Sequence, residues 1–379
     1  MKRTLKQSVT GLILGLMLVG CQKSTTTPNG NNGNNGGNSG TVASFNTIPL
    51  PNASIANGII PVLNEFYVTN RGVYVMMQNS SMLSRSFHKY NGGSGSAAWS
   101  KYEPDFFPVS FMPVNFTSEF DREFSIHWCN GAEGKYGMYN MNNGAPPFEY
   151  DVPTTPLGPG YFTKVASAKK GMHHLWGVAG QEIWSESVVV FPKTFDSIAT
   201  IPGDLGSISC IFADPDDETV LWCGTQTGLY KVGTVSPNAG GDPGILQQWN
   251  LGSNGTFGVT AIIKTDGHLV FQFGNSIFEL VAGQPKEIGS LIVSSGTSAN
   301  ICTDGTRIYA SNGTYYNFNT KTWKSFIGDG VNLSQDQQTK YNLLKGYCSG
   351  AFPIGATTGG GPVYLLMLGE LLSITPSTL

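Results

Sequence analysis

Residues 208–232 read ISCIFADPDDETVLWCGTQTGLYKV, and this stretch decides the fold. Residues 208–213 and 220–224 are short β-favouring runs, and the aspartates and proline between them are turn formers. Thr227-Gly228 is a second turn, and residues 229–232 form a third strand. Three short strands joined by tight turns make an antiparallel meander. A single meander cannot bury both of its faces, so it needs neighbours of the same kind.

Such neighbours recur along the chain. Asp-Gly and Asn-Gly pairs at 266–267, 304–305 and 312–313 suit hairpins, because both central residues of these turns need positive φ. The spacing of roughly 40–50 residues is the period of propeller blades. We therefore predict an all-β fold, a β-propeller with about seven blades, six or eight being possible. The units are 64–90, 123–150, 162–190, 208–232, 259–281, 298–318 and 346–374.

One unit also carries a family resemblance. LWCGT at 221–225, followed by GLY at 228–230, resembles the core of two-component-regulator-type bacterial β-propeller repeats. The resemblance covers this unit only, and it implies the same propeller fold. The serine-aspartate box of sialidase-type propellers and the WD40 spacing are not found.

The amino terminus has the layout of an export signal. Lys2, Arg3 and Lys6 precede an apolar run at 9–19 that is too short to span a bilayer comfortably. The run ends in LVGC at 18–21, which resembles the lipobox of bacterial lipoproteins. The resemblance implies cleavage before Cys21 and acylation of that cysteine, palmitate included. Several acyl chains would give firm membrane anchoring. The alternative is an ordinary secretory signal with an incidental cysteine.

These features predict three parts: a signal peptide at 1–20, a flexible Asn/Gly/Thr-rich tether at 21–41 and the propeller at 42–379. An aspartate directly after the acylated cysteine would favour retention of the lipoprotein at the inner membrane. Gln22 stands at that position, so we expect the protein to be anchored in the outer membrane. The absence of acidic residues directly after Cys21 favours its periplasmic face. The net charge of −3 and the lack of a basic cluster argue against nucleic acid as a partner. A monomer is expected.

No motif for catalysis, a metal or a cofactor stands out. His173 and His174 would face opposite ways on a strand, so they could not easily share an ion. The acidic residues at 214–218 could bind calcium but lack the EF-hand pattern, which favours a solvated turn. Glu119, Asp121 and Glu123 would share one strand face and could do acid–base work, although a solvated edge is the commoner reading.

The predicted function is accordingly a lipid-anchored, non-catalytic binding or scaffolding protein of the cell envelope, with a protein or a glycan as partner. One alternative is a carbohydrate-active propeller enzyme, which a carboxylate pair or a His–carboxylate pair at the central axis would favour. A second is an outer-membrane assembly scaffold. The candidates for ligand binding are His127, His174, Trp176 and Trp184, because an apolar ring with an N–H suits sugars or peptides.

Two further segments are informative. Residues 42–60 would either close the ring by joining the last blade or lie on the surface as a linker, and residues 334–344 are the only modest helical candidate. Cys210 and Cys223 flank the turn at 214–219, and symmetrical folding of that hairpin sets them opposite each other. This predicts a disulfide in the oxidising envelope. The alternative is two buried thiols, favoured if a bulge shifts the register by one residue.

Overall fold

The structure is a computed structural model, and its described residues all lie in one compact unit, Ser39–Leu379. They are 40–51, 60–69, 72–78, 85–93, 98–102, 114–120, 123–130, 135–140, 148–151, 154–155, 158–159, 162–167, 175–186, 195–234, 243–252, 258–293 and 296–376. Cys21 and His174 therefore fall outside the described residues.

Seven four-stranded antiparallel sheets make up the described part of this unit, which confirms the β-propeller. The first three sheets are β2 (Ile60–Thr69), β3 (Gly72–Gln78), β4 (Arg85–Tyr90), β5 (Trp99–Tyr102); β6 (Val114–Phe120), β7 (Glu123–Asn130), β8 (Lys135–Asn140), β9 (Phe148–Asp151); and β12 (Lys164–Ser167), β13 (Leu175–Ala179), β14 (Glu182–Glu186), β15 (Phe195–Thr200).

The next three sheets are β16 (Ile208–Ala213), β17 (Val220–Thr225), β18 (Gly228–Gly233), β19 (Gly244–Asn250); β20 (Val259–Thr265), β21 (His268–Phe273), β22 (Ser276–Val281), β23 (Gln284–Ser290); and β24 (Ile301–Thr303), β25 (Ile308–Ala310), β26 (Thr314–Asn317), β27 (Thr322–Ser325). The last combines β28 (Ile354–Ala356), β29 (Val363–Leu366), β30 (Glu370–Thr375) and β1 (Ser44–Pro49). A two-stranded hairpin, β10 (Thr154–Thr155) with β11 (Gly158–Pro159), and a 3-10 turn, Gly203–Leu205, complete the strand regions.

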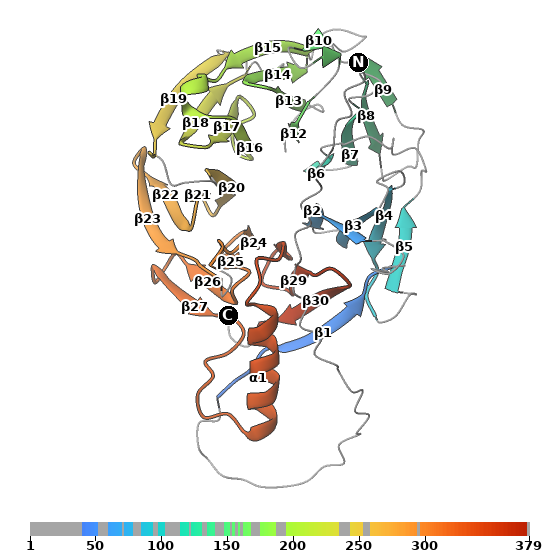
Figure 1. Ribbon diagram of the computed structural model, residues 1–379, viewed down its shortest axis with the longest axis vertical. Helices are drawn as coiled ribbons and strands as arrows, with labels where there is room; N and C mark the ends of the chain where they lie inside the picture. Colours follow the sequence, from blue (N-terminus) through green and yellow to red (C-terminus); the bar gives the residue numbers. More distant parts are fainter. Residues whose placement is uncertain are drawn as a thin grey trace, which may run out of the picture. The chain divides into compact units, whose positions relative to one another are not determined.

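The sheets follow one another around a ring, with the first strand of each repeat nearest the axis (Figure 1). Each of these inner strands contacts the inner strands of the two neighbouring sheets, in the closed order β2, β6, β12, β16, β20, β24, β28 and back to β2. Buried apolar clusters fill the joints between adjacent sheets. The cluster around Trp176, Leu221 and Tyr230, for example, joins the β12–β15 sheet to the β16–β19 sheet.

The predicted turns at 266–267, 304–305 and 312–313 all reverse the chain, but only the first has positive φ at both central residues; at the other two only Gly305 and Gly313 do. Asp266 and Gly267 have φ of 47° and 78°, and the residues that flank them, Thr265 and His268, pair directly. A two-residue loop in this conformation matches the right-handed twist of its strands. The carboxylates at 119–123, however, do not share one strand, because β6 ends at Phe120 and β7 begins at Glu123.

The amino-terminal segment closes the ring, so the closing-strand alternative for 42–60 is the correct one. β1 runs antiparallel to β30 from the pair Ser44–Thr375 to the pair Pro49–Glu370. It forms the outermost strand of the last sheet (Figure 1). Before β1, the Ala43 N–H donates to the Ile327 carbonyl oxygen at 3.1 Å. The segment therefore ties the last sheet to the chain that follows β27.

Tryptophans on the outer strands link neighbouring sheets. The indole N–H of Trp99 on β5 donates to the Pro49 carbonyl oxygen on β1 at 2.8 Å. Trp249 on β19 and Trp323 on β27 donate in the same way to the β22–β23 turn and to β23, at 2.8 Å each. Each indole thus buries its ring at a joint and satisfies its N–H on the adjacent sheet.

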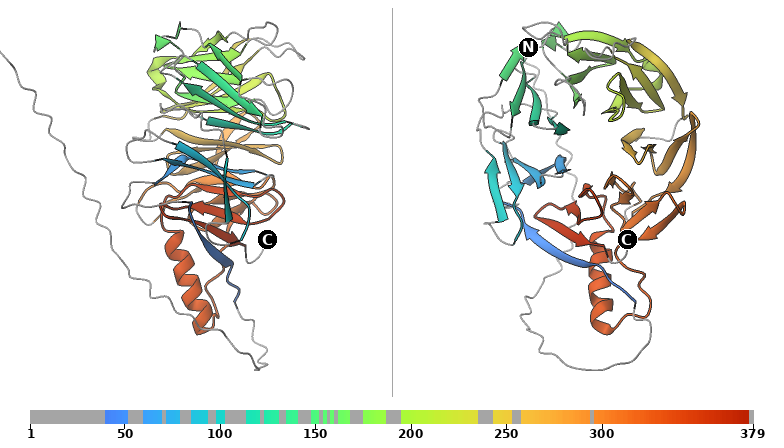
Figure 2. Two further views of the ribbon diagram at one scale, coloured as in Figure 1. Left: turned by 90° about the vertical axis from the view of Figure 1, so that its right-hand side faces the viewer. Right: turned by 180° about the vertical axis from the view of Figure 1, so that it is seen from behind.

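One helix lies outside the ring, α1 (Gln335–Tyr347) (Figures 1 and 2). Ser334 caps it: its hydroxyl accepts from the Gln337 N–H, and the Gln337 side chain accepts from the Ser334 N–H. This capping box fixes the start of the helix where the sequence predicted it. Leu344 buries the inner face of α1 against the joint between the last two sheets. No helix in the described ranges is long and apolar enough to cross a membrane.

The predicted Cys210–Cys223 disulfide is wrong, because the register is shifted by one residue. The shift is already present beside the turn, where Ala213 pairs with Leu221, so Cys210 lies opposite Gly224 and Cys223 opposite Ile211. A bulge at Ser209 follows only after these pairs. The two side chains then lie on opposite faces of the sheet, since Cys223 belongs to the joint with the preceding sheet and Cys210 packs at the joint with the following one. Both are free thiols.

We therefore expect peptide mapping without reduction to recover Cys210 and Cys223 as alkylatable thiols. In the folded protein at pH 8 their reaction with iodoacetamide should be slow, because burial raises the pKa of Cys210 to about 11 and that of Cys223 well above its usual value. Unfolding in urea should make both react quickly. Recovery of a linked Cys210–Cys223 peptide would contradict this register.

His88 on β4 should make stability depend on pH. The side chain is 4% exposed, and burial, aided by the positive charge of Lys101, lowers its pKa to about 4. The unfolded chain therefore binds more protons than the folded one between about pH 6.5 and 4. Stability present above pH 6.5 is lost as the pH falls, by about 3 kcal/mol at pH 4. Urea unfolding at pH 7 and pH 4.5 measures this loss, and His88→Gln should remove most of it.

Candidate functional site

A pocket of about 260 Å³ lies where three inner strands meet, β2, β24 and β28. The strands belong to the first and the last two sheets, so the closure by β1 brings the pocket together. Among the described residues, its lining side chains include apolar groups, three hydroxyls and one thiol, and none of them is charged. The lining residues are Phe66, Tyr67, Val68, Thr69, Cys302, Thr303, Ile354, Gly355 and Ala356.

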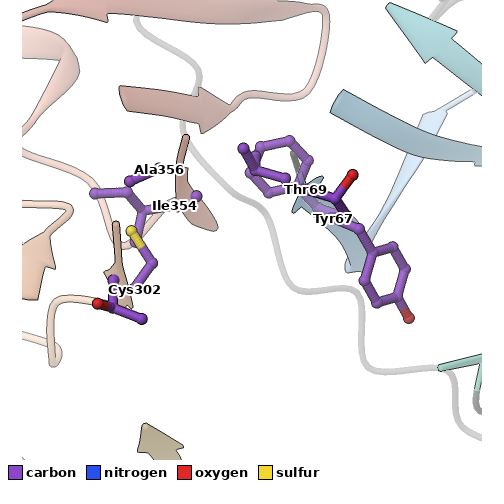
Figure 3. A pocket seen from close by; sticks show the side chains of 9 residues that line it. Tyr67, Thr69, Cys302, Ile354 and Ala356 are labelled. Carbon is purple, nitrogen blue, oxygen red and sulfur yellow. The ribbon is translucent and has the colours of Figure 1, made fainter. Parts of the chain in front are cut away.

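Alternation along the strands decides which side chains meet. Cys302, Ile354 and Ala356 belong to the apolar joint between the last two sheets. Figure 3 shows these three on one side of the pocket, with Thr69 and Tyr67 on the other and the Tyr67 ring directed away from them. Gly355 permits the close approach of β2 to β28, because a Cβ atom there would collide with Val68.

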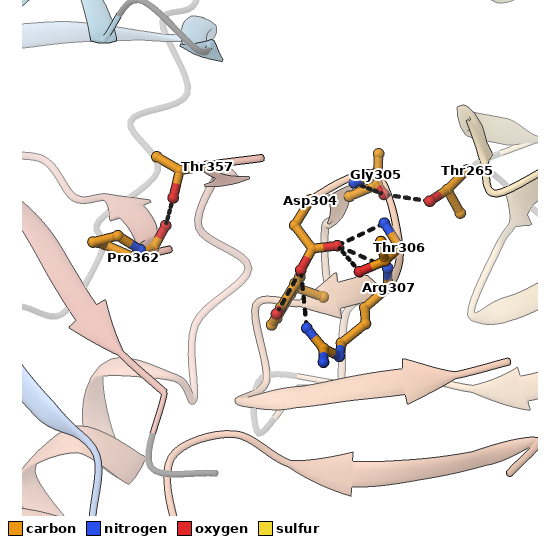
Figure 4. A network of polar contacts seen from close by, with 9 residues as sticks. Thr265, Asp304, Gly305, Thr306, Arg307, Thr357 and Pro362 are labelled. Atoms are coloured by element: carbon orange, nitrogen blue, oxygen red, sulfur yellow. Dashed lines mark hydrogen bonds and ion pairs between the residues drawn. The ribbon is translucent and has the colours of Figure 1, made fainter. Parts of the chain in front are cut away.

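A buried carboxylate holds one wall of the pocket. Asp304 follows the lining residue Thr303 and is 1% exposed. Its side chain accepts from the backbone N–H groups of Thr306 and Arg307, at 2.8 Å each, which folds the turn back on itself (Figure 4). The Tyr309 hydroxyl donates to it at 3.0 Å and the Arg307 guanidinium at 3.3 Å. Burial and the charge of Asp304 both raise the pKa of Tyr309.

Neighbouring sheets hold the same turn from both sides. The Thr303 hydroxyl donates to the Thr265 hydroxyl on β20 at 2.9 Å and accepts from the Gly305 N–H at 2.9 Å. On the other side, the Gly359 N–H of the β28–β29 hairpin donates to the Asp304 carbonyl oxygen at 3.1 Å. The wall formed by β24 is therefore fixed before any ligand binds.

The Cys302 thiol is not prepared for nucleophilic chemistry. Burial raises its pKa well above the usual value, and the negative charge of Asp304 raises it further. The thiol therefore stays protonated at neutral pH, and the protonated form is a poor nucleophile. Cys302 acts in the pocket as a small apolar group with a weak S–H donor.

Two of the residues predicted to bind ligand, Trp176 and Trp184, are described with their side chains, and neither lines this pocket. Trp176 on β13 is fully buried in a joint, so it is a core residue. Trp184 is half-buried on β14, the third strand of its sheet. His127 lies on β7, a second strand, and its side chain is outside the description, as is all of His174. The residues that do line the pocket lie on the first strand of three repeats, β2, β24 and β28. These strands carry no sequence motif, and the only signal for them in the sequence is their place just before a tight turn.

The other chemical candidates of the sequence are structural. Asp214 is buried and accepts from the Trp222 indole N–H at 2.9 Å and from Lys264 at 2.6 Å, so it is not part of a solvated turn. Burial opposes its ionisation, but the hydrogen bonds from Lys264 and Trp222 outweigh burial and lower the pKa of Asp214. Across the described ranges, no three His, Cys, Asp or Glu side chains are grouped to hold a metal ion.

A His–carboxylate pair exists, but away from the axis. His268 Nδ1 and Glu279 Oε1 are 2.5 Å apart on β21 and β22, the second and third strands of their sheet. The imidazole also stacks on Phe318 with ring centroids 4.2 Å apart. This pair therefore joins two sheets and does not reach the inner strands.

Comparisons with known proteins support the fold. No protein-family model matches the chain, and no curated protein matches it. One similar solved structure is the extracellular domain of BT4673 from B. thetaiotaomicron, assigned to a hybrid two component system. It is 12% identical to this chain with a TM-score of 0.53, and the match covers 89% of this chain and 43% of that one. Another, assigned to a one component system, is 14% identical with a TM-score of 0.49, over 87% and 39%.

The chain thus spans less than half the length of those two structures. At 12% identity, the similarity to the hybrid two component system structure shows a shared fold and nothing more.

Proposed function

We propose that this protein is a lipid-anchored binding or scaffolding protein of the cell envelope without catalytic activity. The observation that carries the proposal is the uncharged lining of the pocket between β2, β24 and β28. Such a lining can hold part of a partner by shape and by uncharged contacts. Acid–base catalysis uses positioned titratable groups. Of the two described lining residues that could act in this way, Cys302 has a pKa raised by burial and Tyr67 has its ring directed away from the opposite wall.

The anchoring half of the proposal is supported by the sequence. The charged start, the apolar run and LVGC at 18–21 occur in the order that lipoprotein export requires. Metabolic labelling with a fatty-acid probe should mark the wild type and leave Cys21→Ala unlabelled. The labelled wild type should be found in the membrane fraction, and Cys21→Ala should not. Labelling of both proteins, or of neither, contradicts the anchor.

The binding half can be tested in cells by photo-crosslinking. Thr358 is exposed in the hairpin that follows the lining residue Ala356, so a benzophenone amino acid there would sample whatever occupies the pocket. Leu246 on the outer strand β19 is 51% exposed and provides a control position. We expect a discrete adduct from Thr358 and none of the same mass from Leu246. Identical patterns from both positions, or no adduct from Thr358, would count against a specific partner at the pocket.

A further inference from the structure

The pocket chemistry narrows the class of partner. We infer that the pocket binds an extended, uncharged peptide segment of a partner protein, with one apolar side chain inserted between β2, β24 and β28. The inference rests on the proposed binding function and chooses between protein and glycan as its partner.

Size and charge set the first limit. A volume of about 260 Å³ lies below the roughly 300–1,000 Å³ typical of sites for drug-sized ligands. It therefore suits a single side chain or a single ring. No charged side chain is among its described lining residues, so a charged group inserted beside them would lose hydration without gaining a partner from them. The occupant should be neutral.

Existing hydrogen bonds disfavour a sugar. The Thr303 hydroxyl already donates to Thr265 and accepts from the Gly305 N–H. The Thr69 hydroxyl donates to the Gly72 carbonyl oxygen at 3.3 Å. A sugar ring would bring several hydroxyls against Phe66, Ile354 and Ala356, where they would lose water without full replacement. An apolar side chain makes no such demand.

The strand edges favour a peptide. β24 and β28 stand first and last in the strand order of their sheets, with no further strand at the inner edge in the described part of the chain. Such edges present backbone N–H and C=O groups that an extended segment can pair with. Main-chain bonds would hold the segment, and the uncharged pocket would select its side chain.

The test uses the full chain and a displayed library of random seven-residue peptides, with a panel of neutral oligosaccharides as the competing class. Cys302→Tyr and Ala356→Leu both enlarge side chains that line the pocket, and two variants guard against one failing to fold. Thr322→Tyr places the same tyrosine on β27, the exposed outer strand of the same sheet as Cys302. Circular dichroism and the unfolding midpoint establish which variants are folded.

We expect enrichment of uncharged peptides with a central apolar residue. Their affinity should fall by about tenfold or more in each folded pocket variant and stay within about twofold in Thr322→Tyr. No enrichment, equal binding to the pocket variants, or selection of charged peptides overturns the inference. Oligosaccharide binding that the pocket variants abolish also overturns it, in favour of a glycan.

These outcomes separate the inference from the proposed function. A Thr358 adduct in cells, combined with no selective peptide binding, overturns the peptide assignment and leaves the binding function standing. If neither the Thr358 adduct nor selective peptide binding is found, both the peptide assignment and the proposed binding function are overturned.

Discussion

Replacing Ile48 with alanine is expected to lower the free energy of unfolding by about 2–5 kcal/mol, the range for large-to-small changes in a core. Ile48 is fully buried on β1, pairs with Leu371 and packs in the joint between the last and first sheets. The cavity would weaken the strand that closes the ring as well as the joint itself. Urea unfolding followed by tryptophan fluorescence measures the loss.

Asn46→Ala is the matched control for this experiment. Asn46 lies two residues earlier on β1 and is exposed. Its replacement should change stability by no more than about 0.5 kcal/mol. Equal effects of the two substitutions would mean that β1 does not close the ring through its buried face.

Asp304→Ala should be as damaging or more so, with a loss of about 3–5 kcal/mol. The substitution leaves the buried Tyr309 hydroxyl and two part-buried backbone N–H groups without their acceptor, and it removes the ion partner of Arg307. The turn that supports Thr303 would lose its shape, so peptide binding at the pocket should weaken too. Thermal and urea unfolding measure the first effect, and the selected peptides report the second.

Two comparisons isolate the role of this carboxylate. Asp304→Asn keeps the size of the side chain but loses the charge, so its free energy of unfolding should lie between that of the wild type and that of Asp304→Ala. Asp196→Ala removes an exposed aspartate on β15 and should cost no more than about 0.5 kcal/mol. A loss for Asp304→Ala no greater than that for Asp196→Ala would refute the supporting role of the turn.

The repeat pattern could be predicted because hairpin turns are local. Asp266-Gly267 specifies a chain reversal through the conformations of two residues, and the Asp304 side chain folds its own turn by accepting from the N–H groups of Thr306 and Arg307. The seven repeats followed from counting such turns. The start of α1 was equally local, since Ser334 and Gln337 form its cap within one turn.

Register and site depended on distant contacts. The register shift that separates Cys210 from Cys223 begins beside the turn, at the pair Ala213–Leu221, where the next residue, Asp214, accepts from Lys264 of the next sheet at 2.6 Å. Symmetrical folding of the hairpin cannot reveal a bond to a sheet that comes later in the chain. The pocket was missed for the same reason, because Phe66, Cys302 and Ile354 meet only when the ring is closed.

The pairing of β1 with β30 also constrains the order in which the protein can be made. Ser44 leaves the ribosome among the first residues of the ring, and its partner Thr375 is among the last. β1 must therefore wait, unpaired, through the synthesis of every other sheet. Contacts between residues so far apart are slow to form, because the chain entropy between them must be lost first. The joint that assembles the pocket should be the final one to form, so ligand binding can report when folding is complete.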